Sequence, residues 1–105
     1  MPTERHDKLV RDRIPEIVTA SGARPETRVA DPVEYRALLR AKLVEEVQEF
    51  LQDENPAELA DILEVIHALG QDLGMDSDEL ERRREKKVTE RGSFSTRTVL
   101  VAVHT

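Results

Sequence analysis

The sequence contains no cysteine and no tryptophan, and very few of its 105 residues are aromatic. Without cysteine, the chain has no disulfide bonds, no thiolate metal ligands and no cysteine nucleophile. Its aromatic residues are Tyr35, Phe50 and Phe94. Because so few large side chains leave little material for a core, we expect a partner subunit to supply part of it.

Long apolar runs and an excess of positive charge are also absent. No apolar run approaches the roughly 20 residues that span a bilayer, and the polar residues 1–8 differ from a secretory signal. The net charge of −6 argues against general affinity for nucleic acids or anionic membranes. We therefore expect a cytoplasmic protein with one domain over residues 1–105 and with no nucleic-acid or membrane partner.

Three common catalytic motifs are missing as well. The sequence has no HExxH, no GxSxG and no GxxxxGK[ST], which argues against zinc proteases, serine hydrolases and P-loop enzymes. An acidic protein can still bind a polyanionic nucleotide if metal ions mediate the contact.

The positions of proline, glycine and capping residues divide the chain into helices. Asp31-Pro32 followed by Glu34 predicts a helix start with a capping box, and the apolar spacing stays helical to about Asp53. Asn55-Pro56 with Glu58 repeats the signal, and this second helix is expected to run to Gly74.

Three further elements are expected around these two helices. A helix of one or two turns is predicted after Pro15, ending at Gly22, and Ser77 is predicted to cap a highly charged helix that ends near Gly92. Residues 28–30 and 98–103 are candidates for a short two-stranded ribbon. The predicted fold is all-α, an antiparallel helical bundle with two long helices joined by a tight turn.

Carboxylates gather on one face of the first long helix. At about 100° per residue, Lys42, Glu46 and Glu49 fall within a narrow arc beside the apolar stripe, with Glu45 at its edge. On the second helix, Glu58 and Asp61 also share a face, because they are three residues apart. If the helices pack through their apolar stripes, the carboxylates of both helices converge.

Converging carboxylates repel one another unless some take up protons or a cation lies between them. Hard oxygen ligands of this kind select Mg²⁺ or Mn²⁺ and not zinc. A solvated acidic face produces the same spacing, so the residues alone leave both interpretations open. Lys42 likewise fits either a phosphate contact or an exposed ion pair with Glu46.

The order of these motifs resembles a known family. KLVEEVQE at 42–49 followed by ELADILEVI at 58–66 is similar to the all-α nucleotide pyrophosphohydrolase superfamily, which includes the MazG proteins, dimeric dUTPases and phosphoribosyl-ATP pyrophosphohydrolases. The opening KLVRDRIPEIV and the late ERGSF resemble the phosphoribosyl-ATP pyrophosphohydrolase-like branch. The connection between the two acidic motifs is shorter here than is usual in that family.

The resemblance implies a MazG-like fold and a magnesium-dependent enzyme that releases pyrophosphate from a nucleoside triphosphate or related nucleotide. It assigns the metal to Glu46, Glu49, Glu58 and Asp61, and the activation of the attacking water to Glu45. A metal-bound water has a lowered pKa, and a carboxylate outside the ligand shell can take its proton.

Basic residues outside the acidic motifs are candidates for phosphate contacts. Lys87 and Arg91 lie four residues apart before the turn at Gly92, and Lys8 and Arg11 lie in the N-terminal motif. Charge runs such as residues 81–91 are more often solvated faces. No pattern in the sequence identifies a preferred base.

Two hypotheses from different classes remain. The first is the nucleotide pyrophosphohydrolase, and the second is a non-catalytic helical interaction or regulatory module. Both predict a homo-oligomer, either a dimer or a tetramer, because apolar residues spread over more than half of the circumference of the first long helix.

Overall fold

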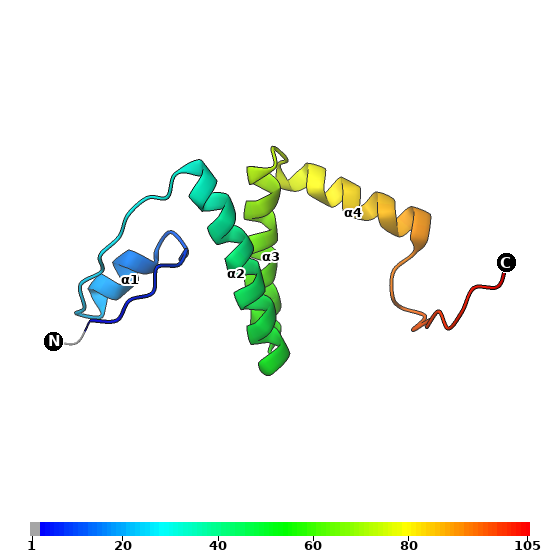
Figure 1. Ribbon diagram of the computed structural model, residues 1–105, viewed down its shortest axis with the longest axis horizontal. Helices are drawn as coiled ribbons and strands as arrows, with labels where there is room; N and C mark the ends of the chain where they lie inside the picture. Colours follow the sequence, from blue (N-terminus) through cyan, green and yellow to red (C-terminus); the bar gives the residue numbers. More distant parts are fainter. Residues whose placement is uncertain (1–2) are drawn as a thin grey trace.

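The computed structural model describes residues 3–105, and within that range it contains four helices and no strand (Figure 1). The helices are α1 (Ile14–Ala20), α2 (Pro32–Gln52), α3 (Pro56–Asp72) and α4 (Ser77–Arg91). The prediction of an all-α fold is confirmed. None of these helices is long and apolar enough to cross a membrane.

The starts of α2 and α3 follow from their capping residues. Asp31 accepts a hydrogen bond from the backbone nitrogen of Glu34 at 2.9 Å, and Asn55 accepts one from Ala57 at 2.9 Å. Each cap satisfies a backbone donor that the first turn of a helix leaves free. The predicted capping box is only half formed, since the Glu34 carboxylate pairs with Arg28.

Two predicted helix boundaries differ from those in the structure. Asp76, and not Ser77, caps α4, because its carboxylate accepts from the backbone nitrogen of Glu79 at 2.8 Å while Ser77 is already helical. Helix α3 ends at Asp72, and Gly74 follows in the left-handed region with a φ of 87°.

The predicted ribbon is also absent from the described residues. Residues 28–30 and 98–103 form no strand, and most of them are exposed. A strand needs a neighbour for its backbone hydrogen bonds, and neither segment has one within the part of the chain that the structure describes.

Helices α2 and α3 form an antiparallel pair at the centre of the molecule (Figure 1). An ion pair between Arg36 Nε and Asp72 Oδ2, 2.6 Å apart, joins the start of α2 to the end of α3. The seam between the helices buries Leu39 and Val65, which are the only buried hydrophobic side chains among residues 3–105.

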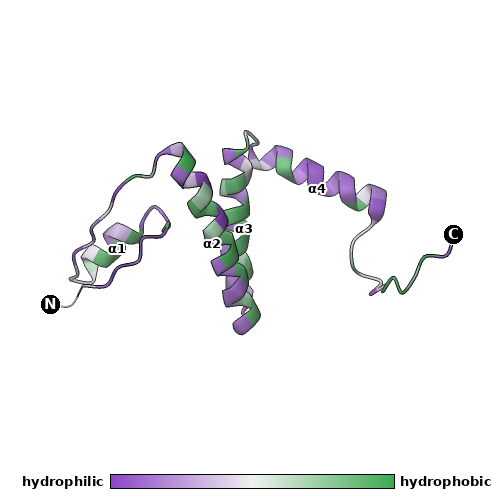
Figure 2. Ribbon diagram, in the orientation of Figure 1, coloured by the Kyte–Doolittle hydropathy of each residue, from purple (hydrophilic) through white to green (hydrophobic). Residues whose placement is uncertain are grey.

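The remaining elements extend away from this pair. Helix α4 leaves the end of α3 and contacts it near the turn, where Leu80 lies against Gly70, whereas α1 lies on the other side of α2 (Figure 1). Figure 2 shows that α4 is mostly hydrophilic while α3 carries much of the hydrophobic surface. The segment before α1 and the segment after α4 lie toward opposite ends of the longest dimension, which is 65 Å.

The chain exposes far more surface than a compact monomer. Its accessible area is 9642 Å², whereas about 6,000 Å² is expected for a folded monomer of this mass. Its radius of gyration is 18.4 Å, compared with about 13 Å for a compact domain of this length. Much apolar surface is therefore left uncovered by this chain alone.

The seam between α2 and α3 gives a first prediction. Leu39→Ala should lower the free energy of unfolding by about 2–5 kcal/mol, because it removes a buried side chain and leaves a cavity. Leu100→Ala is the matched control, since Leu100 is 77% exposed, and it should change stability by no more than about 0.5 kcal/mol. Chemical denaturation at one fixed protein concentration measures both. If Leu39→Ala and Leu100→Ala lowered the free energy of unfolding by the same amount, the seam between α2 and α3 would not be the core.

Candidate metal centre

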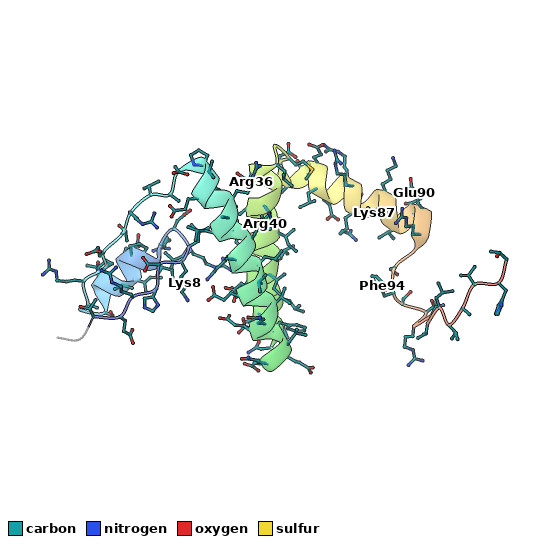
Figure 3. All side chains as sticks on the ribbon, viewed as in Figure 1. Lys8, Arg36, Arg40, Lys87, Glu90 and Phe94 are labelled. Atoms are coloured by element: carbon teal, nitrogen blue, oxygen red, sulfur yellow. The ribbon has the colours of Figure 1, made fainter. Side chains whose placement is uncertain are left out.

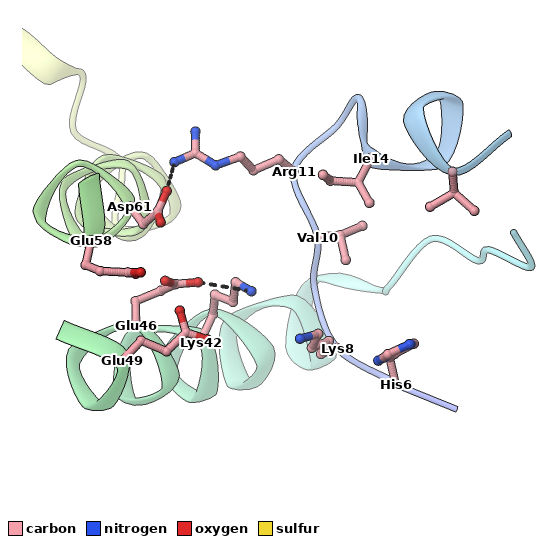
Figure 4. A pocket seen from close by; sticks show the side chains of 11 residues that line it. His6, Lys8, Val10, Arg11, Ile14, Lys42, Glu46, Glu49, Glu58 and Asp61 are labelled. Carbon is pink, nitrogen blue, oxygen red and sulfur yellow. Dashed lines mark hydrogen bonds and ion pairs between the residues drawn. The ribbon is translucent and has the colours of Figure 1, made fainter. Parts of the chain in front are cut away.

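The carboxylates of α2 and α3 meet at the seam between the two helices (Figure 4). Carboxylate oxygens of Glu46, Glu58 and Asp61 all lie within 4.8 Å of one another, and those of Glu45, Glu46 and Glu49 form a second such group. Glu46 belongs to both groups. Two helices that are consecutive in sequence therefore place four acidic side chains around Glu46.

Glu46 is the least expected side chain in this position. It is only 6% exposed, and its Oε2 atom has no hydrogen-bond partner. The Oε2 atom of Glu58 is likewise buried without a partner. Burying a carboxylate oxygen without a partner is unfavourable, so both atoms are free to take up a proton or a ligand.

The surroundings of Glu46 favour its protonated form in the absence of such a ligand. Burial raises the pKa of Glu46, and the neighbouring Glu49 raises it further. Lys42 opposes this effect through an ion pair with Glu46 Oε1 at 3.2 Å, but does not cancel it. A divalent cation would hold the carboxylate ionised without a proton.

Lys42 and Glu45 form an ion pair at the edge of the cluster, and each shifts the pKa of the other. Burial alone would lower the pKa of Lys42. The hydrogen bonds to Glu46 and Glu45 and the charges of these two carboxylates outweigh the effect of burial, so the pKa of Lys42 lies above its ordinary value. The hydrogen bond from Lys8 lowers the pKa of Glu45, helped by the charge of Lys42 and opposed by partial burial. At neutral pH, Lys42 is therefore a cation and Glu45 an anion.

Two basic residues from the N-terminal segment reach the same cluster. Lys8 Nζ lies 3.0 Å from Glu45 Oε1, and Arg11 Nη2 lies 2.7 Å from Asp61 Oδ1. Both were singled out from the sequence as phosphate contacts. In this structure they pair with Glu45 and Asp61, to which the family resemblance assigns roles in catalysis and in metal binding.

Lys87 and Arg91 lie elsewhere. They belong to α4, which extends away from the α2–α3 pair, and Figure 3 shows Lys87 far from Lys8. Among residues 3–105, neither side chain forms an ion pair with a carboxylate. One copy of the chain therefore does not bring them to the carboxylates.

A pocket of about 440 Å³ lies between the carboxylates and the N-terminal segment (Figure 4). One wall consists of Lys42 and the acidic side chains of α2 and α3. The facing wall comes from the N-terminal segment, where Lys8 and Arg11 flank an apolar strip that was not foreseen from the sequence; the strip is formed by Val10, Ile14 and Val18. The spacing of four residues between these apolar side chains is the feature of the sequence that could have predicted a shared apolar face. His6 also lines this wall.

Comparisons with known proteins add little to this geometry. No family model matches the chain, and no solved structure does. A stretch of 42 residues is 57% identical to an uncharacterized protein of Mycolicibacterium smegmatis and covers 40% of this chain. The chain spans 43% of that relative's length, so the match assigns no family and no activity.

Repulsion within the cluster gives a second prediction. Glu49→Gln should raise the melting temperature of the metal-free protein at neutral pH, because it removes a charge beside the buried Glu46. The gain should disappear at a pH below the ordinary pKa of glutamate, where Glu46 is protonated in both the folded and the unfolded state and carries no charge to repel.

Glu64→Gln is the control for this prediction, since Glu64 is exposed on α3 and belongs to neither carboxylate group. It should leave the melting temperature nearly unchanged. A lower melting temperature for Glu49→Gln in the presence of a chelator would contradict the repulsion.

Proposed function

We propose that the protein hydrolyses a nucleoside triphosphate or a related nucleotide to the monophosphate and pyrophosphate, with magnesium as cofactor and manganese as a substitute. The single observation that carries this proposal is the buried Glu46, which joins two carboxylate groups and keeps one oxygen without a partner. Such an atom fits a metal ligand better than it fits a solvated acidic face. The resemblance to the MazG-like superfamily supports the same assignment.

The residues present suit a hard divalent cation. Glu46, Glu58 and Asp61 form one carboxylate group, and Glu49 shares the other group with Glu46. These four side chains would hold the cation, and they offer carboxylate oxygens alone. Carboxylates are the ligands that Mg²⁺ and Mn²⁺ prefer, while the sequence has no cysteine and the two groups contain no histidine. When bound, magnesium polarises the phosphates and lowers the pKa of a coordinated water.

The chain supplies a proton acceptor and a cation beside this site. Glu45 is an anion at neutral pH, as an acceptor of the water's proton must be, although Lys8 and Lys42 lower its pKa and so weaken it as a base. Lys42 lines the pocket with its charge held by Glu45 and Glu46, in position to contact a phosphate oxygen. The apolar wall opposite would accommodate the less polar part of the nucleotide.

A second candidate, a non-catalytic interaction module, has one observation in its favour. Glu45 and Asp61 already have cationic partners within the chain, so part of the acidic cluster is neutralised without a metal. That arrangement leaves the free oxygens of Glu46 and Glu58 unexplained. The two candidates differ in whether pyrophosphate is released.

A third prediction tests the activity directly. The protein, incubated with magnesium and each of the common nucleoside triphosphates, should release pyrophosphate from at least one of them. Glu49→Gln should abolish the release, because the amide keeps the side-chain volume but removes the charge that faces the metal. Glu64→Gln should retain wild-type activity. Retention of most activity by folded Glu49→Gln would overturn the assignment of Glu49.

A fourth prediction concerns magnesium without catalysis. A ligand that binds only the folded state should stabilise it by about 2.7 kcal/mol at a hundredfold excess over its Kd. The melting temperature should therefore rise with magnesium in the wild type and much less in Glu49→Gln. A wild-type curve indifferent to magnesium, even with a non-hydrolysable nucleotide, would favour the interaction module.

We further propose that the protein is a homo-oligomer, a dimer or a dimer of dimers. Large hydrophobic side chains are exposed on both central helices, including Val44 (56%) and Leu51 (70%) on α2 and Leu63 (52%) on α3. A second copy would bury these faces in a two-fold interface. It would also allow Lys87 and Arg91 of one copy to approach the carboxylates of another.

A fifth prediction follows from this proposal. Sedimentation at micromolar concentration should give a mass of two or four times 12.0 kDa. Leu51→Glu should shift the mass toward the single chain, since it places a charge within the exposed apolar face. Glu64→Lys also changes charge at an exposed position and serves as the control. A wild-type mass of 12.0 kDa would show that no second copy covers these helices.

A further inference from the structure

The N-terminal strap, defined here as residues 6–18, crosses the open side of the carboxylate cluster. In Figure 4 it runs past α2 and α3 with Arg11 extended toward Asp61. It supplies the whole apolar wall of the pocket, while α2 and α3 supply the acidic wall. Any ligand in the pocket would therefore contact both the strap and the carboxylates.

Side-chain ion pairs fasten the strap to the helical pair. No backbone hydrogen bond joins residues 3–30 to α2 or α3. The two ion pairs are Lys8 with Glu45 and Arg11 with Asp61, and the four side chains are between 30% and 54% exposed. Partly exposed ion pairs are weak and exchange readily for other partners.

The position of Arg11 conflicts with a metal ion at Asp61. Its guanidinium lies 2.7 Å from Asp61 Oδ1, and an oxygen of Asp61 lies within 4.8 Å of oxygens of Glu46 and Glu58. A divalent cation held by these three carboxylates would lie close to the guanidinium. Two cations on one carboxylate repel each other, so their binding is mutually unfavourable.

We propose that Arg11 is a counter-cation that exchanges partners: it neutralises Asp61 in the metal-free protein and turns to a phosphate of the nucleotide when the metal binds. This inference rests on the proposed function, because it takes Asp61 as a metal ligand. The guanidinium suits both partners, since its planar donors match carboxylate and phosphate geometry equally. The strap thereby couples metal loading to the capture of substrate.

The first half of the exchange, in which Arg11 competes with the metal for Asp61, is tested by measuring the binding of Mn²⁺ alone with electron paramagnetic resonance. Arg11→Gln should bind Mn²⁺ about two- to fivefold more tightly than the wild type, because the competing cation is gone. Arg11→Lys should bind it about as tightly as the wild type. Arg13→Gln is the matched control, since Arg13 pairs with Glu16 on its own segment, and it should change nothing.

Binding of a non-hydrolysable nucleoside triphosphate in saturating Mn²⁺ tests the second half. Arg11→Gln should weaken this binding at least about tenfold, the loss expected for a charge-assisted hydrogen bond. Tighter Mn²⁺ binding together with weaker nucleotide binding distinguishes the exchange from general damage to the fold, because a damaged fold would bind both ligands more weakly.

The outcomes distinguish this inference from the proposed function. If the wild type binds Mn²⁺ and the nucleotide but Arg11→Gln binds Mn²⁺ equally or more weakly, the exchange is wrong and the metal site stands. If Arg11→Gln binds Mn²⁺ more tightly yet holds the nucleotide as well as the wild type, Arg11 does not reach the phosphates. If the wild type binds no Mn²⁺, both proposals fail.

Discussion

The buried carboxyl group of Glu46 is the constraint on which the site depends. Its carboxylate lies at the seam of α2 and α3, where Leu39 and Val65 form the small hydrophobic core. Such burial is costly unless a cation compensates it, and Lys42 compensates only one of its oxygens. The other carboxylates surround Glu46. Their negative charge attracts Lys8 and Arg11 of the N-terminal strap, which pair with Glu45 and Asp61.

This arrangement explains why a chain with so little core can still hold a defined site. The caps at Asp31 and Asn55 fix where α2 and α3 begin. The packing of Leu39 and Val65, together with the ion pair between Arg36 and Asp72, sets their antiparallel register. The register sets which carboxylates meet. The apolar faces left outside the seam then require cover from another source, and the excess of exposed surface is the physical basis for proposing a second copy.

Much of this local structure could be predicted from the sequence. Proline after a capping residue marked the starts of α2 and α3, and helical spacing placed Glu46 and Glu49 on one face and Glu58 and Asp61 on another. The strap could not be predicted in the same way, because Arg11 meets Asp61 across fifty residues through side chains alone. The predicted ribbon was wrong, since residues 98–103, although rich in β-branched side chains, have no neighbouring strand within residues 3–105. The roles of the carboxylates in metal binding and catalysis stay predictions.

The most direct measurement of the central claim is a crystal structure of the protein soaked in Mn²⁺, with anomalous diffraction data. The account predicts a strong anomalous peak between the carboxylates of Glu46, Glu58 and Asp61, within bonding distance of the two oxygens that now have no partner. Data of adequate quality that show no peak there, with Arg11 still bound to Asp61, would contradict it.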